Sequence, residues 1–131
     1  MTMTTSARLG RLLILLAATV LLIDGVLQLT SPPSMIAALE HIGYPAKAGP
    51  SLSLLTIACA LFLAVPMTSL VGAVLTTGFL GGAIAVHVPA SGLGSPPQLV
   101  CVALGFLVWG GLFLADRRLP ALLGFGTATP E

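Results

Sequence analysis

Residues 48–88 read AGPSLSLLTIACALFLAV, then PMT, then SLVGAVLTTGFLGGAIAVHV. The first run, residues 48–65, contains no charged residue, and the second, residues 69–88, contains none apart from a His87 cation. At about 1.5 Å per residue, each run is long enough as a helix to cross a hydrocarbon core of roughly 30 Å. Pro66 ends the first run, and so short a connection makes the two helices antiparallel. The segment therefore predicts a transmembrane helical hairpin.

Two further apolar runs flank this hairpin. Residues 98–115 are uncharged, and residues 9–29 carry only Arg11 and Asp24 as charged side chains. Hydrophobic residues make up 56% of the chain and charged residues 7%, whereas soluble domains contain about 25% charged residues. A soluble fold of this length cannot hide so much apolar surface. We therefore predict an all-α transmembrane four-helix bundle, with residues 1–131 as one domain in a lipid bilayer.

The basic residues predict the orientation of this bundle. With four spans both termini share one side, and that side collects Arg8, Arg11, Arg117 and Arg118, whereas the other side has only Lys47. Lys and Arg in short flanking segments resist translocation. Both termini are therefore expected to be cytoplasmic, and the opposite ends of the helices to form the outer half.

The connection between the first two spans has the signals of a short helix. Ser31 precedes two prolines, an Ala- and Leu-containing run follows, and Gly43 and Pro45 then end it. Pro at the first helical position and Gly after the last are typical start and stop signals. We predict a short interfacial helix over residues 32–42, lying across the outer mouth of the bundle.

Polar residues of several helices are expected to meet at this outer level. Asp24 and Gln28 lie four residues apart and so share one face of the first helix. His87 ends the third span and Gln98 begins the fourth at a similar height. With the short helix included, the predicted ligand-binding residues are Asp24, Gln28, Glu40, His41, Tyr44, His87 and Gln98. Adjacent helical residues diverge by about 100°, so at most one of the pair at 40 and 41 is expected to face inward.

Asp24 is the residue that most strongly suggests a functional site. A charged side chain at mid-bilayer costs about 2.5–3.5 kcal/mol on insertion scales and marks a functional hypothesis that needs a partner. We predict His87 as that partner, because a carboxyl and an imidazole together can exchange protons near neutral pH. Three roles remain open for the pair: a structural contact between helices, a ligand contact and acid/base catalysis.

The sequence lacks the motifs of several common catalytic and metal-binding sites. It contains no CxxC, no HxxxH, no P-loop and no GxSxG, so no metal site is predicted and no cofactor is indicated. Five basic and four acidic residues give no electrostatic footprint for nucleic acid.

A series of short motifs in fixed order carries a family resemblance. These motifs are DGVLQLTSPP at 24–33, HIGYP at 41–45, PMT at 66–68, TGFLGGA at 77–83, VWGGL at 108–112 and DRRL at 116–119. In this order the chain resembles the DoxX-like family of small bacterial membrane proteins over about residues 15–123. The chain departs from the family at Gln28, where members often carry Lys, and at Met67, where a basic residue is common.

This resemblance implies a four-helix protein of the bacterial inner membrane with a short helix after the first span. Some members are associated with thiosulfate:quinone oxidoreduction or with oxidative-stress partners, so quinone enters as an analogy.

We accordingly predict that the protein binds a small lipophilic molecule, quinone- or isoprenoid-like, in a polar-lined pocket formed by Asp24, Gln28 and His87. One alternative is an intramembrane acid/base enzyme, an isomerase or an epoxide-opening enzyme, in which Asp24 and His87 are catalytic. Another is an accessory subunit of a membrane oxidoreductase complex. It would dock a membrane protein partner, or a second copy of itself, through the small residues Gly78 and Gly82.

Overall fold

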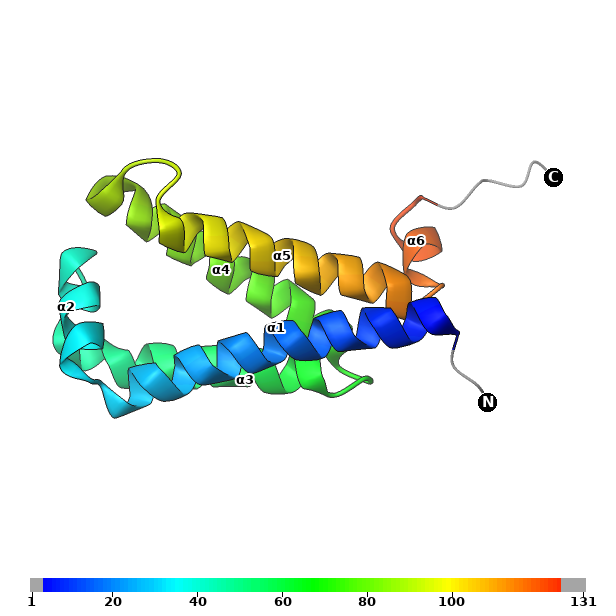
Figure 1. Ribbon diagram of the computed structural model, residues 1–131, viewed down its shortest axis with the longest axis horizontal. Helices are drawn as coiled ribbons and strands as arrows, with labels where there is room; N and C mark the ends of the chain where they lie inside the picture. The colour runs from blue at the N-terminus through cyan, green and yellow to red at the C-terminus, as the bar shows by residue number, and fades with distance from the viewer. Residues whose placement is uncertain (1–3, 126–131) are drawn as a thin grey trace.

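The protein is helical from end to end of the described chain. The computed structural model describes residues 4–125, in which no strand occurs. Its elements, shown in Figure 1, are α1 (Thr5–Thr30), α2 (Pro33–His41), the 3₁₀ turn η1 (Ala46–Ala48), α3 (Gly49–Ala64), α4 (Ser69–Ser91), α5 (Pro96–Ala115) and α6 (Leu119–Leu122). The four long helices, with η1 counted as part of α3, are long and apolar enough to cross a membrane. The predicted all-α four-helix bundle is confirmed.

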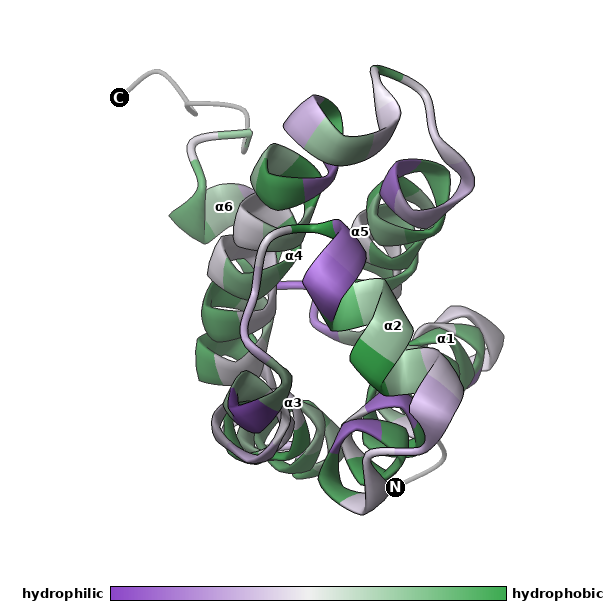
Figure 2. Cartoon of the chain, turned by 90° about the vertical axis from the view of Figure 1, so that its left-hand side faces the viewer, coloured by the Kyte–Doolittle hydropathy of each residue, from purple (hydrophilic) through white to green (hydrophobic). Residues whose placement is uncertain are grey.

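The helices alternate in direction around the bundle. α1 packs against α3 and α5, and α4 packs against the same two helices, so α1 and α4 are diagonal to each other. Both ends of the described chain lie at one end of the bundle, and α2 lies at the other (Figure 1). We call these the termini end and the α2 end. Viewed along the bundle, α2 crosses its end (Figure 2). That α2 lies in a membrane interface stays a prediction.

Local sequence explains where the helices start and stop. The Thr4 side chain caps α1 by accepting a hydrogen bond from the Ala7 amide, and proline occupies the first turn of α2, α3 and α5, where its missing N–H costs nothing. We expected the third span to end before Pro89, but α4 continues to Ser91. A proline this close to the end of a helix removes only one hydrogen bond, and Gly92, with φ of 75°, ends the helix instead.

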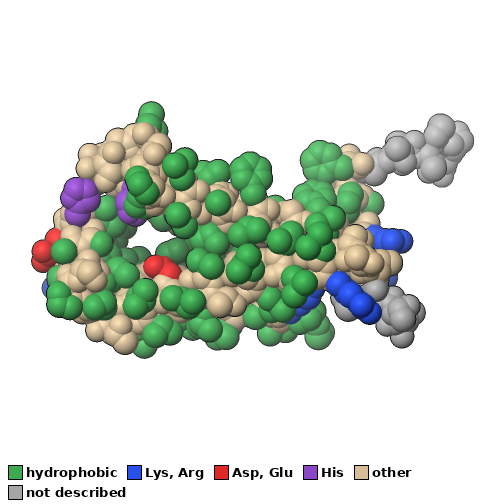
Figure 3. Space-filling model, viewed as in Figure 1, with side chains coloured by type: hydrophobic (Ala, Val, Ile, Leu, Met, Phe, Trp, Pro, Cys, Tyr) green, Lys and Arg blue, Asp and Glu red, His purple; other side chains and the backbone are tan. Residues whose placement is uncertain are grey.

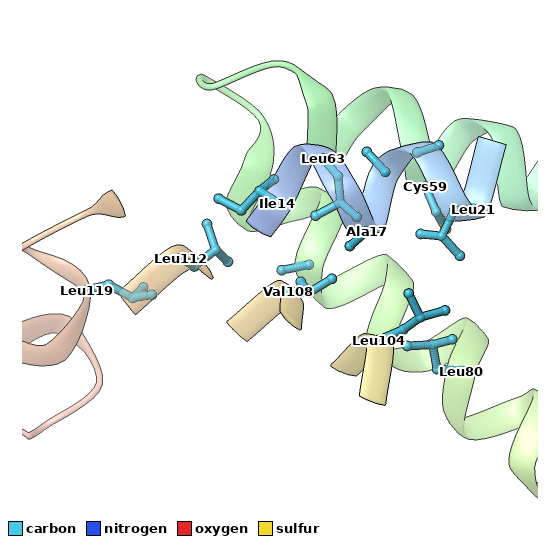
Figure 4. Close-up of a cluster of buried hydrophobic side chains, with 13 residues drawn as sticks. Ile14, Ala17, Leu21, Cys59, Leu63, Leu80, Leu104, Val108, Leu112 and Leu119 are labelled. Carbon is cyan, nitrogen blue, oxygen red and sulfur yellow. The ribbon is translucent and has the colours of Figure 1, made fainter. Parts of the chain in front are cut away.

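The buried core lies between the four long helices and nearer the termini end (Figure 4). Two glycines let the backbones meet there. A Cβ on Gly10 would lie 2.5 Å from the carbonyl oxygen of Gly111, and a Cβ on Gly72 would lie 2.5 Å from the amide nitrogen of Leu63. These contacts join α1 to α5 and α3 to α4 by close van der Waals packing, the main source of helix association in lipid.

Arg11 fastens the same end of the bundle. Its Nη1 donates to Ser69 Oγ at 3.2 Å, and its Nη2 donates to the carbonyl oxygen of Ala64. Ser69 Oγ in turn donates to the Leu63 carbonyl at 2.8 Å. The last carbonyls of α3 lack helical partners, and a cation is favoured beside them. Arg11 therefore ties α1 to the turn between α3 and α4.

Toward the α2 end the bundle divides into two pairs of helices. α1 stays against α3, where Ser53 Oγ donates to the Gly25 carbonyl at 2.6 Å and a Cβ on Gly25 would lie 2.7 Å from Ile57 Cγ1. α4 stays against α5, where Trp109 Nε1 donates to Thr77 Oγ1 at 2.9 Å. The two pairs, α1/α3 and α4/α5, are close at the termini end and splay apart toward α2 (Figure 1).

The outside of the bundle is apolar. Leu12, Leu54 and Phe106 are 63%, 73% and 77% exposed, and hydrophobic side chains cover most of the face shown in Figure 3. On that face most Lys and Arg side chains lie at the termini end, and the His side chains lie at the α2 end. Lipid is the solvent that such a surface requires. The chain is a multi-pass membrane protein.

Candidate functional site

A cavity of about 880 Å³ occupies the space between the two splayed helix pairs. Residues of α1, α2, α3, α4 and α5 line it, and most of their side chains are apolar. Gly78 and Gly82 of α4 form part of its wall, and a Cβ built on either residue meets no atom within 4 Å apart from the adjacent residues and backbone of its own helix. The space exists because these small residues face helices that have already diverged. A hollow between the helices is visible near the α2 end in Figure 3.

Asp24 and Gln28 enter this cavity from α1. Gln28 Nε2 donates a hydrogen bond to Asp24 Oδ2, as their four-residue spacing predicts. Asp24 is half-buried, whereas Gln28 is only 7% exposed and its Oε1 has no hydrogen-bond partner. The glutamine amide therefore holds the carboxyl group in place, and one carboxyl oxygen stays without a partner from another helix in residues 4–125.

His87 reaches the same cavity from α4. Its Nδ1 lies 2.7 Å from the Ala83 carbonyl oxygen, one turn earlier in the helix. A carbonyl can only accept, so Nδ1 carries the hydrogen and the Nε2 of a neutral ring keeps its lone pair. No hydrogen bond joins Asp24 to His87 in the described chain. The predicted pair thus shares one cavity without a direct hydrogen bond.

The α2 helix forms the wall at the α2 end with its apolar face. The residues that contribute are Met35, Ala38 and Leu39 of α2, followed by Ile42 and Tyr44 just beyond the helix. Neither Glu40 nor His41 is part of this lining. His41 Nε2 instead lies 3.2 Å from Ser91 Oγ at the end of α4, where α2 and α4 approach each other.

Gln98 has a different environment from the one we expected. It is 5% exposed and is not part of the cavity lining. Its Oε1 accepts from the Gly94 amide at 2.8 Å, and its Nε2 donates to the Gly92 carbonyl at 2.7 Å. Its amide therefore braces the loop between α4 and α5. Of the predicted residues, the cavity brings together Asp24, Gln28, Tyr44 and His87.

Sequence reasoning missed part of the lining. Cys101 of α5 borders the cavity, whereas Cys59 is fully buried, and both are free thiols. Gly78 and Gly82 were interpreted as a helix-packing pair, a pattern that does not say whether a helix faces it. A bulky residue at either position would fill the cavity as well as alter a docking face. Within the described chain no group of three His, Cys, Asp or Glu residues could hold a metal ion.

Comparison with known proteins gives a family. No curated protein and no solved structure matches the chain. A family match does cover residues 12–111, from the first turns of α1 to the last turns of α5. This range contains all the cavity-lining residues described above. Because the match extends over most of the sequence, the chain belongs to the DoxX-like family.

Proposed function

We propose that the protein binds a small lipophilic molecule, quinone- or isoprenoid-like, in the cavity between its two helix pairs. Asp24, Gln28, Tyr44 and His87 are the polar contacts of this molecule, and the apolar side chains of the wall enclose its tail. The observation that carries the proposal is the cavity itself, because about 880 Å³ lies within the range of small-molecule sites. An apolar wall with a few converging polar groups is the usual composition of such sites.

The splay of the helices supports entry from the lipid. α1 and α5 touch at Gly10 and Gly111 near the termini end, and they move apart toward the α2 end (Figure 1). A lipophilic molecule dissolved in the bilayer can then reach the cavity sideways, without passing through water.

The hydrogen bonds of Asp24 favour a ligand contact over a structural role. A polar residue that holds a helix bundle together bonds a neighbouring helix. The hydrogen bond to Asp24 among residues 4–125 comes from Gln28 of the same helix. The bundle is instead held by Arg11, Ser53 and the glycine contacts. Asp24 is therefore available to a bound molecule.

The proposal is tested by native mass spectrometry with lipid extraction on gently purified protein. We expect the wild type to retain one lipophilic compound that Asp24→Asn and His87→Ala lose. Glu40→Gln is the matched control, because it neutralises a carboxyl group outside the cavity lining, and it should retain the compound. Gly82→Leu should exclude the compound by filling the cavity. An empty wild-type cavity, with variants that are merely less stable, would refute the proposal.

The proposal also includes the membrane in which the bundle lies and its orientation there. We place the protein in the bacterial inner membrane with both termini in the cytoplasm, since the basic residues lie mostly at the termini end. Reporter fusions at each terminus and in the loop after α4 test this orientation. A terminus that reports a periplasmic position would contradict it.

An acid/base enzyme is the second candidate, and one observation favours it: Asp24 and His87 line the same cavity from different helices. As an isomerase or epoxide-opening enzyme it would use both side chains for proton transfer to a bound lipophile. Asp24→Asn should then abolish turnover of the retained compound and leave the fold intact. Unchanged turnover in this variant would exclude the enzymatic role.

A further inference from the structure

We propose that the cavity selects a lipophilic molecule whose head group donates hydrogen bonds, such as an alcohol, a hydroquinone or an amine, over one that only accepts them. The inference rests on the proposed function, because it concerns the ligand of the same cavity. Of the ligand types named there, it favours an isoprenoid alcohol or the reduced hydroquinone over the quinone itself. It follows from a comparison of the cavity-wall groups that are already hydrogen-bonded within the protein with those that are still free.

The two strongest donor groups of the wall each have a hydrogen engaged within the protein. An amide hydrogen of Gln28 is given to Asp24, and the Nδ1 hydrogen of His87 is given to the Ala83 carbonyl. The described residues that line the cavity include no Lys, Arg, Ser, Thr or Trp. Gln98, whose amide could donate, bonds the Gly92 carbonyl outside the lining. A ligand therefore meets few free hydrogens.

The acceptors of the wall remain open. The Asp24 carboxyl group has two oxygens with several lone-pair directions, of which Gln28 uses one. His87 keeps the Nε2 lone pair of a neutral ring. Pro89 has no N–H, so the carbonyl of Ala85, another lining residue, lacks its usual partner four residues on. The Tyr44 hydroxyl can donate or accept, the Cys101 thiol is only a weak donor, and Gln28 keeps one further amide hydrogen. The polar part of the cavity is thus rich in acceptors.

Apolar surroundings make this imbalance selective. An acceptor without a hydrogen is unfavourable away from water, and a ligand that brings a hydrogen relieves that cost. A ligand with only ether or ketone oxygens places lone pairs against lone pairs. A site built to bond a ligand O–H or N–H discriminates strongly against the analogue that lacks it.

Three ligands with one tail isolate the effect: farnesol, its methyl ether and farnesylamine. The readout is the ligand-induced shift in thermal unfolding of the purified full-length protein, followed by fluorescence of Trp109, the single tryptophan of the chain. Gly82→Leu, with its filled cavity, gives the baseline for effects of the ligands on the detergent. We expect the alcohol to bind at least about tenfold tighter than the ether, the factor that one added hydrogen bond supplies. If farnesylamine binds tighter than farnesol, the natural ligand has an ammonium head group; if farnesol binds tighter, it has a hydroxyl head group. Either order supports the inference.

Two variants test whether the Asp24 side chain is the source of this selectivity. Asp24→Asn presents an amide hydrogen where the wild type presents an oxygen, so the preference for alcohol over ether should fall to within about threefold. Glu40→Gln should keep the full preference. If Asp24→Asn does not fold, the three ligands on the wild type still decide the question.

The outcomes separate the two claims. Equal binding of alcohol and ether, or tighter binding of the ether, would overturn the inference and leave the proposed function standing. Failure of all three ligands to exceed the Gly82→Leu baseline would overturn the proposed function and the inference with it.

Discussion

Glycines on α4 provide a matched pair for testing how the bundle is held. Gly72 and Gly78 lie on the same helix, and alanine at either position should gain the same helix propensity, about 1 kcal/mol. Their surroundings differ. A Cβ at 72 would lie 2.5 Å from the amide nitrogen of Leu63, about 0.9 Å closer than an ordinary contact that begins at 3.4 Å, whereas a Cβ at 78 meets nothing within 4 Å. The difference between the variants therefore isolates the strain.

We expect Gly72→Ala to be less stable than Gly78→Ala by about 1–3 kcal/mol, the usual cost of overpacking against atoms that cannot move aside. Gly78→Ala itself should match or exceed the wild type. Unfolding of both variants in mixed detergent micelles, followed by Trp109 fluorescence, measures the difference. Variants that agree within about 0.5 kcal/mol, the range of neutral surface changes, would refute the close packing of α3 and α4.

Three other perturbations probe separate parts of the structure. Arg11→Met should lower the free energy of unfolding by about 1.5 kcal/mol, the lower end for a charged hydrogen bond because the side chain is only half-buried; an unchanged stability would remove Arg11 from the packing of the termini end. Ser53→Ala should cost about 0.6–1.7 kcal/mol in the same assay, as interhelical hydrogen bonds do in membranes, and no loss would mean that the Gly25 carbonyl needs no partner. A membrane-permeant maleimide should modify Cys101 in the folded protein but leave Cys59 unmodified, as intact-mass and peptide analysis would show; an unmodified Cys101 would mean that the cavity does not reach α5.

Most of the fold could be predicted from the sequence because lipid demands long apolar helices, and such helices are easily recognised. The proline and glycine positions located the turns, although Pro89 did not stop α4. The short helix α6 was not expected, since four residues between Arg118 and Leu123 carry no periodic signal. Its Leu119 is 3% exposed and fixes α6 against the core.

The candidate site was only partly predictable. Depth along a helix can be counted from the sequence, and Asp24, Gln28, Tyr44 and His87, which were expected at one level, line the same cavity. Direction around a helix depends on packing, which a sequence of uniformly apolar helices does not specify. For this reason Gln98 was expected in the pocket, although its amide bonds the loop backbone, and Cys101, three residues later, was overlooked.

The splay between the two helix pairs makes the molecule a wedge. Both glycine contacts that act as its hinge, at Gly10 and at Gly72, lie at the narrow end, so the protein presents a larger cross-section to one leaflet than to the other. Lateral pressure in that leaflet pushes the pairs α1/α3 and α4/α5 toward each other, and this movement reduces the volume of the cavity between them. Affinity for a bound molecule should consequently vary with the shape of the surrounding lipids. Lipids with large headgroups, which crowd the wide end, would weaken binding without contacting any residue of the cavity wall.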